Sequence, residues 1–298
     1  MASPNKSTTV RIASFLARAA ETVAPDWVTE QAFLAFCRPQ RFAPRFGTLE
    51  ASGRGFRLDP GTGELGAWEW NSGGHAGTAL LVHGWSGNAS HLRAFVGPLV
   101  ERGFHVVAVD LPAHGTSPGT FATLMVMADA VRELVHRLQP RLVVAHSLGA
   151  TATTLALLPR VVDAGLAVER VVLLAPPAEM PPYLRHFAQQ VGLSEAVKAR
   201  VLERIEKTIG RPVTELDLRR NARHLAGVRA LVVHDRDDVV TPAAGSRALV
   251  SQWPGARLLE TGGLGHDGVR KAREVVEAAM AFVTGESARA GAGETTAA

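Results

Sequence analysis

The chain has 298 residues, a formal net charge of +4 and one cysteine, with 46% hydrophobic and 20% charged residues. This composition is typical of a globular protein with a sizeable core, and no stretch reaches the roughly 18 apolar residues that a membrane-spanning helix needs. Basic residues alternate with acidic ones and form no stripe, so no nucleic-acid partner is predicted. The single thiol, Cys37, excludes an intrachain disulfide framework. It favours a cytoplasmic location, and we expect it to be a buried structural residue.

The first part of the chain, residues 1–49, predicts a helical extension. Apolar residues between Ile12 and Val23 recur at helical spacing. They indicate a helix packed on the domain or, alternatively, one lying on a membrane surface. A second helix is expected over residues 26–37. Residues 56–70 read as two strands around a Pro-Gly-Gly turn and predict a β-hairpin.

Beyond the hairpin, short aliphatic runs alternate with stretches of helical length. Continuous runs of Val, Leu and Ala are typical of strands buried on both faces. The pattern therefore predicts an α/β fold, a three-layer sandwich in which helices cover both faces of a mostly parallel sheet. The expected strands are residues 78–84, 105–112, 141–147, 170–177, 230–235 and 256–263. The expected helices are residues 89–101, 122–137, 148–159, 243–252 and 268–283.

One connection between these strands is much longer than the others. Residues 178–228 are expected to form a small helical insertion, in which Ser194 caps a helix that ends at Gly210. Basic residues outnumber acidic ones there by nine to six, which we interpret chiefly as a solvated helix face. The core domain runs from 50 to 284. The tail, residues 285–298, has little to bury and is expected to be disordered.

A serine interrupts the apolar run LVVAHSLGAT at residues 142–151. Ser147 follows a predicted buried strand and precedes a helix, with Ala145 and Gly149 two residues away on either side. Small residues are needed there because a sharp strand-to-helix turn brings backbone segments together and strains the central residue. The turn would present the Ser147 hydroxyl at the carboxyl edge of the sheet. The N–H of Leu148 would then point at developing negative charge.

Other predicted strands end in residues that complement this serine. An earlier strand ends in a turn where the backbone N–H of Trp85 would be a second oxyanion donor. A glycine-rich loop after the last strand carries His266, the candidate general base. The loop after a late strand carries Asp235, Asp237 and Asp238, each a candidate for the acid that orients the base.

The chain order serine, acid, histidine, with each member after a predicted strand, resembles the α/β-hydrolase superfamily over residues 50–284. The resemblance implies an eight-stranded, mostly parallel sheet with a helical cap between strands six and seven. It also implies Ser147 as nucleophile, His266 as base and Asp238 as acid, because the acid of this family commonly stands four positions before a proline. Asp237 is the alternative acid.

A serine at this turn favours acyl chemistry, and this chemistry requires no metal or cofactor. We therefore expect a serine esterase or thioesterase that acts on a small-molecule acyl substrate through an acyl-enzyme intermediate. Perhydrolysis, carbon–carbon bond hydrolysis and acyl transfer by the same triad are alternatives. A non-catalytic binding protein is a third class, which is less favoured because no triad member is missing.

Some residues depart from the family pattern or have a structural interpretation. Ala145 and Ala113 stand where glycine is commoner in the family, the second within a structural turn. No pair of histidines has the spacing of a zinc site. The histidines expected to be structural are His83, His114, His146 and His234.

Overall fold

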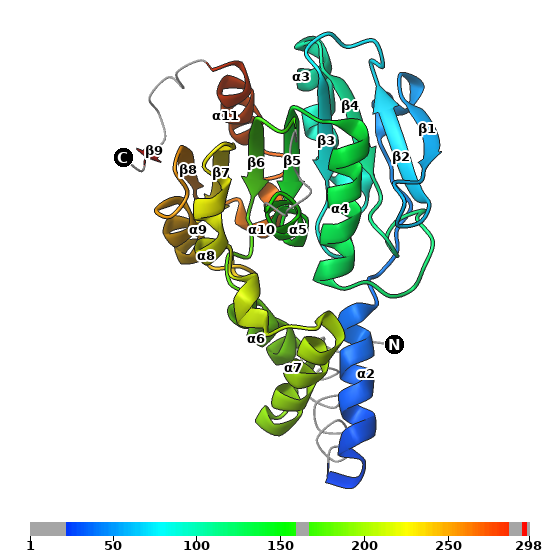
Figure 1. Ribbon diagram of the computed structural model, residues 1–298, viewed down its shortest axis with the longest axis vertical. Coiled ribbons are helices and arrows are strands. Elements are labelled where there is room, and N and C mark those ends of the chain that lie inside the picture. The colour runs from blue at the N-terminus through cyan, green and yellow to red at the C-terminus, as the bar shows by residue number, and fades with distance from the viewer. Residues whose placement is uncertain (1–21, 159–166, 286–293, 297–298) are drawn as a thin grey trace, which may run out of the picture.

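The computed structural model describes residues 22–158, 167–285 and 294–296 (Figure 1). The helix predicted between Ile12 and Val23 lies almost wholly outside these ranges. Among the helices of the described ranges, none combines the length and the hydrophobicity needed to cross a membrane.

The strands form one sheet in the order β1-β2-β4-β3-β5-β6-β7-β8-β9. Neighbours from β4 to β8 are parallel, whereas β1 pairs with β2 and β2 pairs with β4 in antiparallel fashion. The predicted α/β fold with eight mostly parallel strands, including the hairpin, is therefore confirmed. The strands are β1 Arg54–Leu58, β2 Leu65–Trp70, β3 Thr78–Val82, β4 His105–Val109, β5 Leu142–His146, β6 Arg170–Leu174, β7 Arg229–Asp235, β8 Ala256–Thr261 and β9 Glu294–Thr296.

The ninth strand differs from the sequence prediction. Glu294–Thr296 pair antiparallel with β8, whereas the composition of the tail predicts disorder. The edge of a sheet presents unpaired backbone N–H and C=O groups, and an extended segment can pair with them whatever its side chains bury. Composition describes only the side chains, so this pairing was not expected. The other residues of the tail from 286 onwards lie outside the described ranges.

Two groups of helices cover the two faces of the sheet. Leu80 and Val82 of β3 pack with α4, α5 and α9, while Leu81 points to the opposite face with α3 and α11. This alternation follows from the two-residue period of a strand. The helices are α3 Val96–Glu101, preceded by a 3-10 helix at Ala89–Phe95, α4 Leu124–Leu138, α5 Leu148–Ala156, α9 Ala243–Val250, α10 Gly265–Gly268 and α11 Arg273–Thr284.

The segment between β6 and β7 is helical, as expected. Ser194 caps α7 by accepting a hydrogen bond from the N–H of Val197, and Gly210 ends α7 in a left-handed conformation with φ of 73°. These are the start and stop that the sequence predicts. The helices are α6 Met180–Val191, α7 Glu195–Ile209 and α8 Leu218–Asn221, with 3-10 turns at Val213–Leu216 and Ala222–Leu225.

Helix α2 (Pro25–Cys37) lies beside α7, away from the sheet (Figure 1). Arg204 of α7 lies 3.3 Å from Glu30 and places its guanidinium 4.9 Å from the ring centroid of Phe33. Arg200 forms a second ion pair with Asp26. Two of the basic residues interpreted as a solvated helix face therefore pair with acids of α2.

Candidate active site

Ser147 occupies a strained turn between β5 and α5. Its φ of 52° and ψ of −131° lie where a non-glycine residue is rarely found. A Cβ atom on Gly149 would come within 2.1 Å of the carbonyl oxygen of His83, and one on Gly84 within 2.8 Å of the Ser147 Cβ. The predicted close approach of backbone segments is therefore confirmed. It holds the serine at the carboxyl edge of the sheet.

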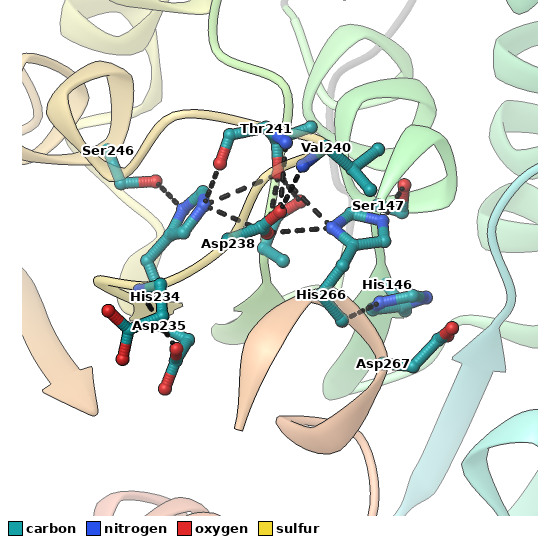
Figure 2. Close-up of polar contacts among 12 residues, drawn as sticks. His146, Ser147, His234, Asp235, Asp238, Val240, Thr241, Ser246, His266 and Asp267 are labelled. Atoms are coloured by element: carbon teal, nitrogen blue, oxygen red, sulfur yellow. Dashed lines mark hydrogen bonds and ion pairs between the residues drawn. The ribbon is translucent and has the colours of Figure 1, made fainter. Parts of the chain in front are cut away.

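His266 connects the predicted serine to one of the predicted acids (Figure 2). Its Nε2 lies 2.9 Å from Ser147 Oγ, and its Nδ1 lies 2.7 Å from Asp238 Oδ2. The loop that carries it turns through Gly263 and Gly265, which have φ of 77° and 61°. Since only glycine adopts such angles without strain, these residues permit the approach of the imidazole to Ser147.

The carboxylate of Asp238 is fully buried and accepts several hydrogen bonds. Its Oδ1 accepts the N–H groups of Val240 at 2.8 Å and Thr241 at 2.9 Å, and its Oδ2 accepts the Thr241 hydroxyl at 2.8 Å. Burial alone would raise the pKa of Asp238. Hydrogen bonds from His234 and His266, and the charge on His266, outweigh burial and hold that pKa well below its usual range. Asp238 is therefore ionised at neutral pH.

The two other acids of this loop point away from Nδ1 of His266. Asp237 Oδ2 accepts the N–H of Gly263 at 2.8 Å. Asp235 Oδ2 accepts the Thr261 hydroxyl at 2.7 Å and the N–H of Leu264 at 3.1 Å. Both carboxylates therefore stabilise the loop that carries His266.

Two further residues contact Asp238 and were not expected to do so. His234 is fully buried, with Nε2 3.3 Å from Asp238 Oδ2 and Nδ1 2.6 Å from Ser246 Oγ. Thr241 donates its hydroxyl to the same carboxylate. The spacing Asp-x-x-Thr is a signal for a side chain capping its own loop, and it would have identified Thr241. No pattern identifies His234, since this contact depends on the path of the loop.

His146, expected to be structural, contacts the backbone of the loop that carries His266. Its Nε2 donates to the carbonyl oxygen of His266 over 3.0 Å, and the two ring centroids are 4.9 Å apart. Burial, followed by the charge on His266, lowers the pKa of His146 to about 3. The ring is therefore neutral at pH 7 and able to keep this contact.

The turns after β3 and β4 contain the other structural residues. His83 Nε2 accepts the N–H of Leu111 at 3.0 Å, and burial holds the pKa of His83 well below its usual range. His114 Nδ1 donates to the carbonyl oxygen of Pro112 at 2.9 Å. Ala113 has a φ of 65°, which explains why glycine is commoner at this position in the family.

Leu148 directly follows the serine, and Trp85 lines the same cavity as the serine. Leu148 is the first residue of α5, so its backbone N–H has no intrahelical acceptor. Trp85 follows Gly84, the glycine that packs against the Ser147 Cβ. That these two N–H groups bind an oxyanion stays a prediction.

Ser147 and His266 open into a cavity of about 290 Å³, here called the polar cavity. Arg270, Asp267 and His91 line it. Arg270 donates from Nε to Asp267 Oδ1 at 2.9 Å and from Nη1 to the carbonyl oxygen of His91 at 3.2 Å. Within the described ranges, no group of three or more His, Cys, Asp or Glu side chains could hold a metal ion.

Cys37 carries the single thiol of the sequence. Cys37 is 1% exposed, and burial raises its pKa to about 12. The predicted buried cysteine is confirmed, and at neutral pH it is a protonated, unreactive group.

Solved structures resemble this chain across most of its length. An esterase from Pyrococcus furiosus is 16% identical, with a TM-score of 0.63, over 84% of this chain and 100% of its own. A serine hydrolase from Cycloclasticus zankles is 17% identical, with a TM-score of 0.58, over 78% and 98%. Est1E from Butyrivibrio proteoclasticus, a structure with bound ferulic acid, is 20% identical, with a TM-score of 0.62, over 78% and 98%. At these identities the likeness shows a shared fold.

The sequence itself matches a family model. No curated protein matches the chain. The model described as the alpha/beta hydrolase family matches residues 79–278, which is more than half of the chain. The chain therefore belongs to the alpha/beta hydrolase family, and its enzyme class is that of a hydrolase.

Proposed function

We propose that the protein hydrolyses carboxylic esters or thioesters with Ser147 as nucleophile, His266 as general base and Asp238 as the acid that orients it. The observation that carries this proposal is the placement of the His266 ring, which contacts Ser147 Oγ at 2.9 Å and Asp238 Oδ2 at 2.7 Å. A serine hydroxyl is a poor nucleophile until a base in contact removes its proton. The ionised Asp238 would fix the tautomer of that base.

The reaction then has two halves. Ser147 Oγ attacks the carbonyl carbon of the ester while His266 Nε2 takes its proton, and the backbone N–H groups of Leu148 and Trp85 stabilise the oxyanion. The tetrahedral intermediate collapses, and His266 returns the proton to the departing alcohol or thiol. Water activated by His266 attacks the acyl-enzyme, and the acid product leaves with Ser147 regenerated.

The proposal extends to the organisation of the chain. We assign residues 50–284 to the hydrolase domain, 178–228 to a helical cap and 1–49 to a helical extension. The support is the position of α6 and α7 between β6 and β7, with α2 beside them. A single buried thiol supports a cytoplasmic location.

Labelling by a fluorophosphonate probe tests the nucleophile directly. We expect a single adduct, which peptide mass spectrometry locates on Ser147, with p-nitrophenyl butanoate and butanoyl thioesters hydrolysed by the same preparation. Product analysis with an added alcohol or hydrogen peroxide separates hydrolysis from acyl transfer and perhydrolysis. An unlabelled, inactive protein with an intact fold would instead favour a non-catalytic binding protein.

A further inference from the structure

Two apolar cavities lie near the candidate active site. The first, here called the proximal cavity, measures about 30 Å³ and is lined in part by Leu148, which follows the serine, and by Trp85. The second, the distal cavity, measures about 260 Å³ and lies between α6 and α7. Trp85 also lines the polar cavity that contains Ser147. The polar cavity therefore adjoins the proximal cavity at Trp85, and the proximal cavity in turn shares lining residues with the distal cavity.

Three side chains line both apolar cavities and therefore separate them: Phe36 of α2, Leu184 of α6 and Ile205 of α7. Phe36 stacks on Trp85, with ring centroids 6.3 Å apart and planes inclined by 18°. The aromatic pair thus connects the wall of the polar cavity to the barrier between the apolar cavities. One of its rings comes from α2, which lies outside the residues that match the family model.

We propose that the proximal cavity receives the acyl chain of the substrate and that Phe36, Leu184 and Ile205 end it, so that the enzyme prefers short, unbranched acyl groups. This proposal rests on the proposed ester hydrolysis at Ser147. The side of the serine that leads to Leu148 and Trp85 is apolar, whereas Arg270, Asp267 and His91 line the polar cavity. A hydrocarbon chain is more stable on the apolar side, and the leaving group remains on the polar side.

The size of the proximal cavity sets the length of chain. About 30 Å³ holds two or three groups the size of water, since roughly 10–15 Å³ is needed for each. An acyl group of about four carbons, counted from the carbonyl carbon beside Ser147, fills that space. A longer chain meets the barrier. The distal cavity beyond it is about nine times larger, taking 260 Å³ against 30 Å³.

Opening the barrier should convert the two cavities into one channel. We would measure kcat/KM for p-nitrophenyl ethanoate, butanoate, octanoate and dodecanoate with the wild-type protein and with Phe36→Ala. The wild-type value is expected to peak at butanoate. Each methylene that gains an apolar contact raises kcat/KM by up to about fourfold. Phe36→Ala should therefore raise the octanoate-to-butanoate ratio at least about tenfold and shift the peak to octanoate or beyond.

Matched variants separate this effect from a general loosening of the helices. Trp27→Ala removes another aromatic ring of α2, which is 61% exposed and lines neither cavity, and should leave the chain-length profile unchanged. Ala188→Phe, placed in the Phe36→Ala protein, refills the distal cavity that Ala188 lines and should restore the preference for butanoate. If Phe36→Ala does not fold, Phe36→Leu and Leu184→Ala test the same barrier.

Binding supplies a readout that does not depend on catalysis. Calorimetry with dodecanoate should show tighter binding, by at least about tenfold, to Phe36→Ala than to the wild-type protein. If no variant hydrolyses any ester while dodecanoate still distinguishes the two proteins, the proposed hydrolysis fails and the cavity assignment stands. If the esters are hydrolysed but Phe36→Ala keeps the wild-type profile and the wild-type binding of dodecanoate, the barrier assignment is overturned.

Discussion

The two sides of the candidate site are held in different ways. On the sheet side, Ser147, His266 and Asp238 follow the ends of β5, β8 and β7 and are fixed by short hydrogen bonds in which only His266 is partly exposed. On the helical side, α2, α6 and α7 meet through apolar side chains, and exposed ion pairs lie at the rim of the contact between α2 and α7. The first arrangement gives fixed geometry, whereas the second allows the shape of a pocket to change at little cost in stability.

The largest expected effect lies on the sheet side. Ser147→Ala should lower kcat for p-nitrophenyl butanoate by on the order of a millionfold, as loss of a triad nucleophile does, because no other group can form the acyl-enzyme. Steady-state kinetics measures the loss, and circular dichroism checks that the fold is kept. A variant that retained a tenth of the wild-type rate would show that the nucleophile lies elsewhere.

Replacing Asp238 and Asp237 in turn tests whether one carboxylate alone orients His266. Asp238→Asn should lower kcat by on the order of ten-thousandfold, because the amide would stabilise the wrong tautomer of His266. Asp237→Asn, at the residue directly before Asp238, changes only a contact to Gly263 and should cost less than about tenfold. Steady-state kinetics on the two variants, measured in parallel, compares their losses of kcat. Equal losses would mean that the loop as a whole, and not the Asp238 carboxylate, sets the rate.

Acid should destabilise the sheet side through buried histidines. The pKa of His146 is about 3 in the folded protein and about 6.5 in an unfolded chain. Between these values the unfolded chain binds a proton that the folded protein does not, so the free energy of unfolding falls as pH falls from about 6.5 towards 3. His146 contributes roughly 1 kcal/mol per pH unit to this slope.

Urea unfolding at a series of pH values from neutral down to about 4.5 measures the slope. In His146→Asn the slope should be smaller by the roughly 1 kcal/mol per pH unit that His146 contributes. His83 and His114 are unchanged in that variant, and the lowered pKa of each keeps part of the wild-type slope. An identical slope in both proteins would contradict the assignment.

The smallest effects are expected where α2 meets α7. Arg204→Ala removes the ion pair with Glu30 and the contact with the Phe33 ring, and should reduce the free energy of unfolding by about 1 kcal/mol or less. Added salt should shrink the difference, because exposed pairs are screened. Lys207→Ala on the same helix is the control. A loss of several kcal/mol in the free energy of unfolding would show that the contact between α2 and α7 stabilises the protein as strongly as contacts on the sheet side do.

The sequence was most informative where a side chain follows the end of a strand. Ser147 and His266 were predictable because buried strands and turn glycines define the points at which each emerges. The choice between Asp237 and Asp238 was harder, since both stand in one loop and only its path decides which carboxylate faces His266. Without the family resemblance, the residue pattern alone did not decide between the two acids.

Contacts between elements that lie far apart in the sequence leave no comparable pattern in it. Arg200 and Arg204 are spaced as an exposed helix face would be, and nothing in that spacing identifies the acids of α2 as their partners. His146 was expected to be structural, but nothing in the sequence indicates that its side chain, at the end of β5, contacts the backbone of His266 after β8. Pairing of Glu294–Thr296 with β8 uses backbone groups alone, which no side-chain pattern predicts.

The loop between β7 and α9 has a consequence for how the base and the acid move. Asp238 contacts the imidazole of His266, while Asp235 and Asp237 hold the N–H groups of Leu264 and Gly263 just before it. Any displacement of one loop must therefore carry the other along. The proposed proton acceptor and the proposed orienting carboxylate should therefore move together, so that thermal motion at the mouth of the site would change the distance to the substrate before it changed their mutual alignment.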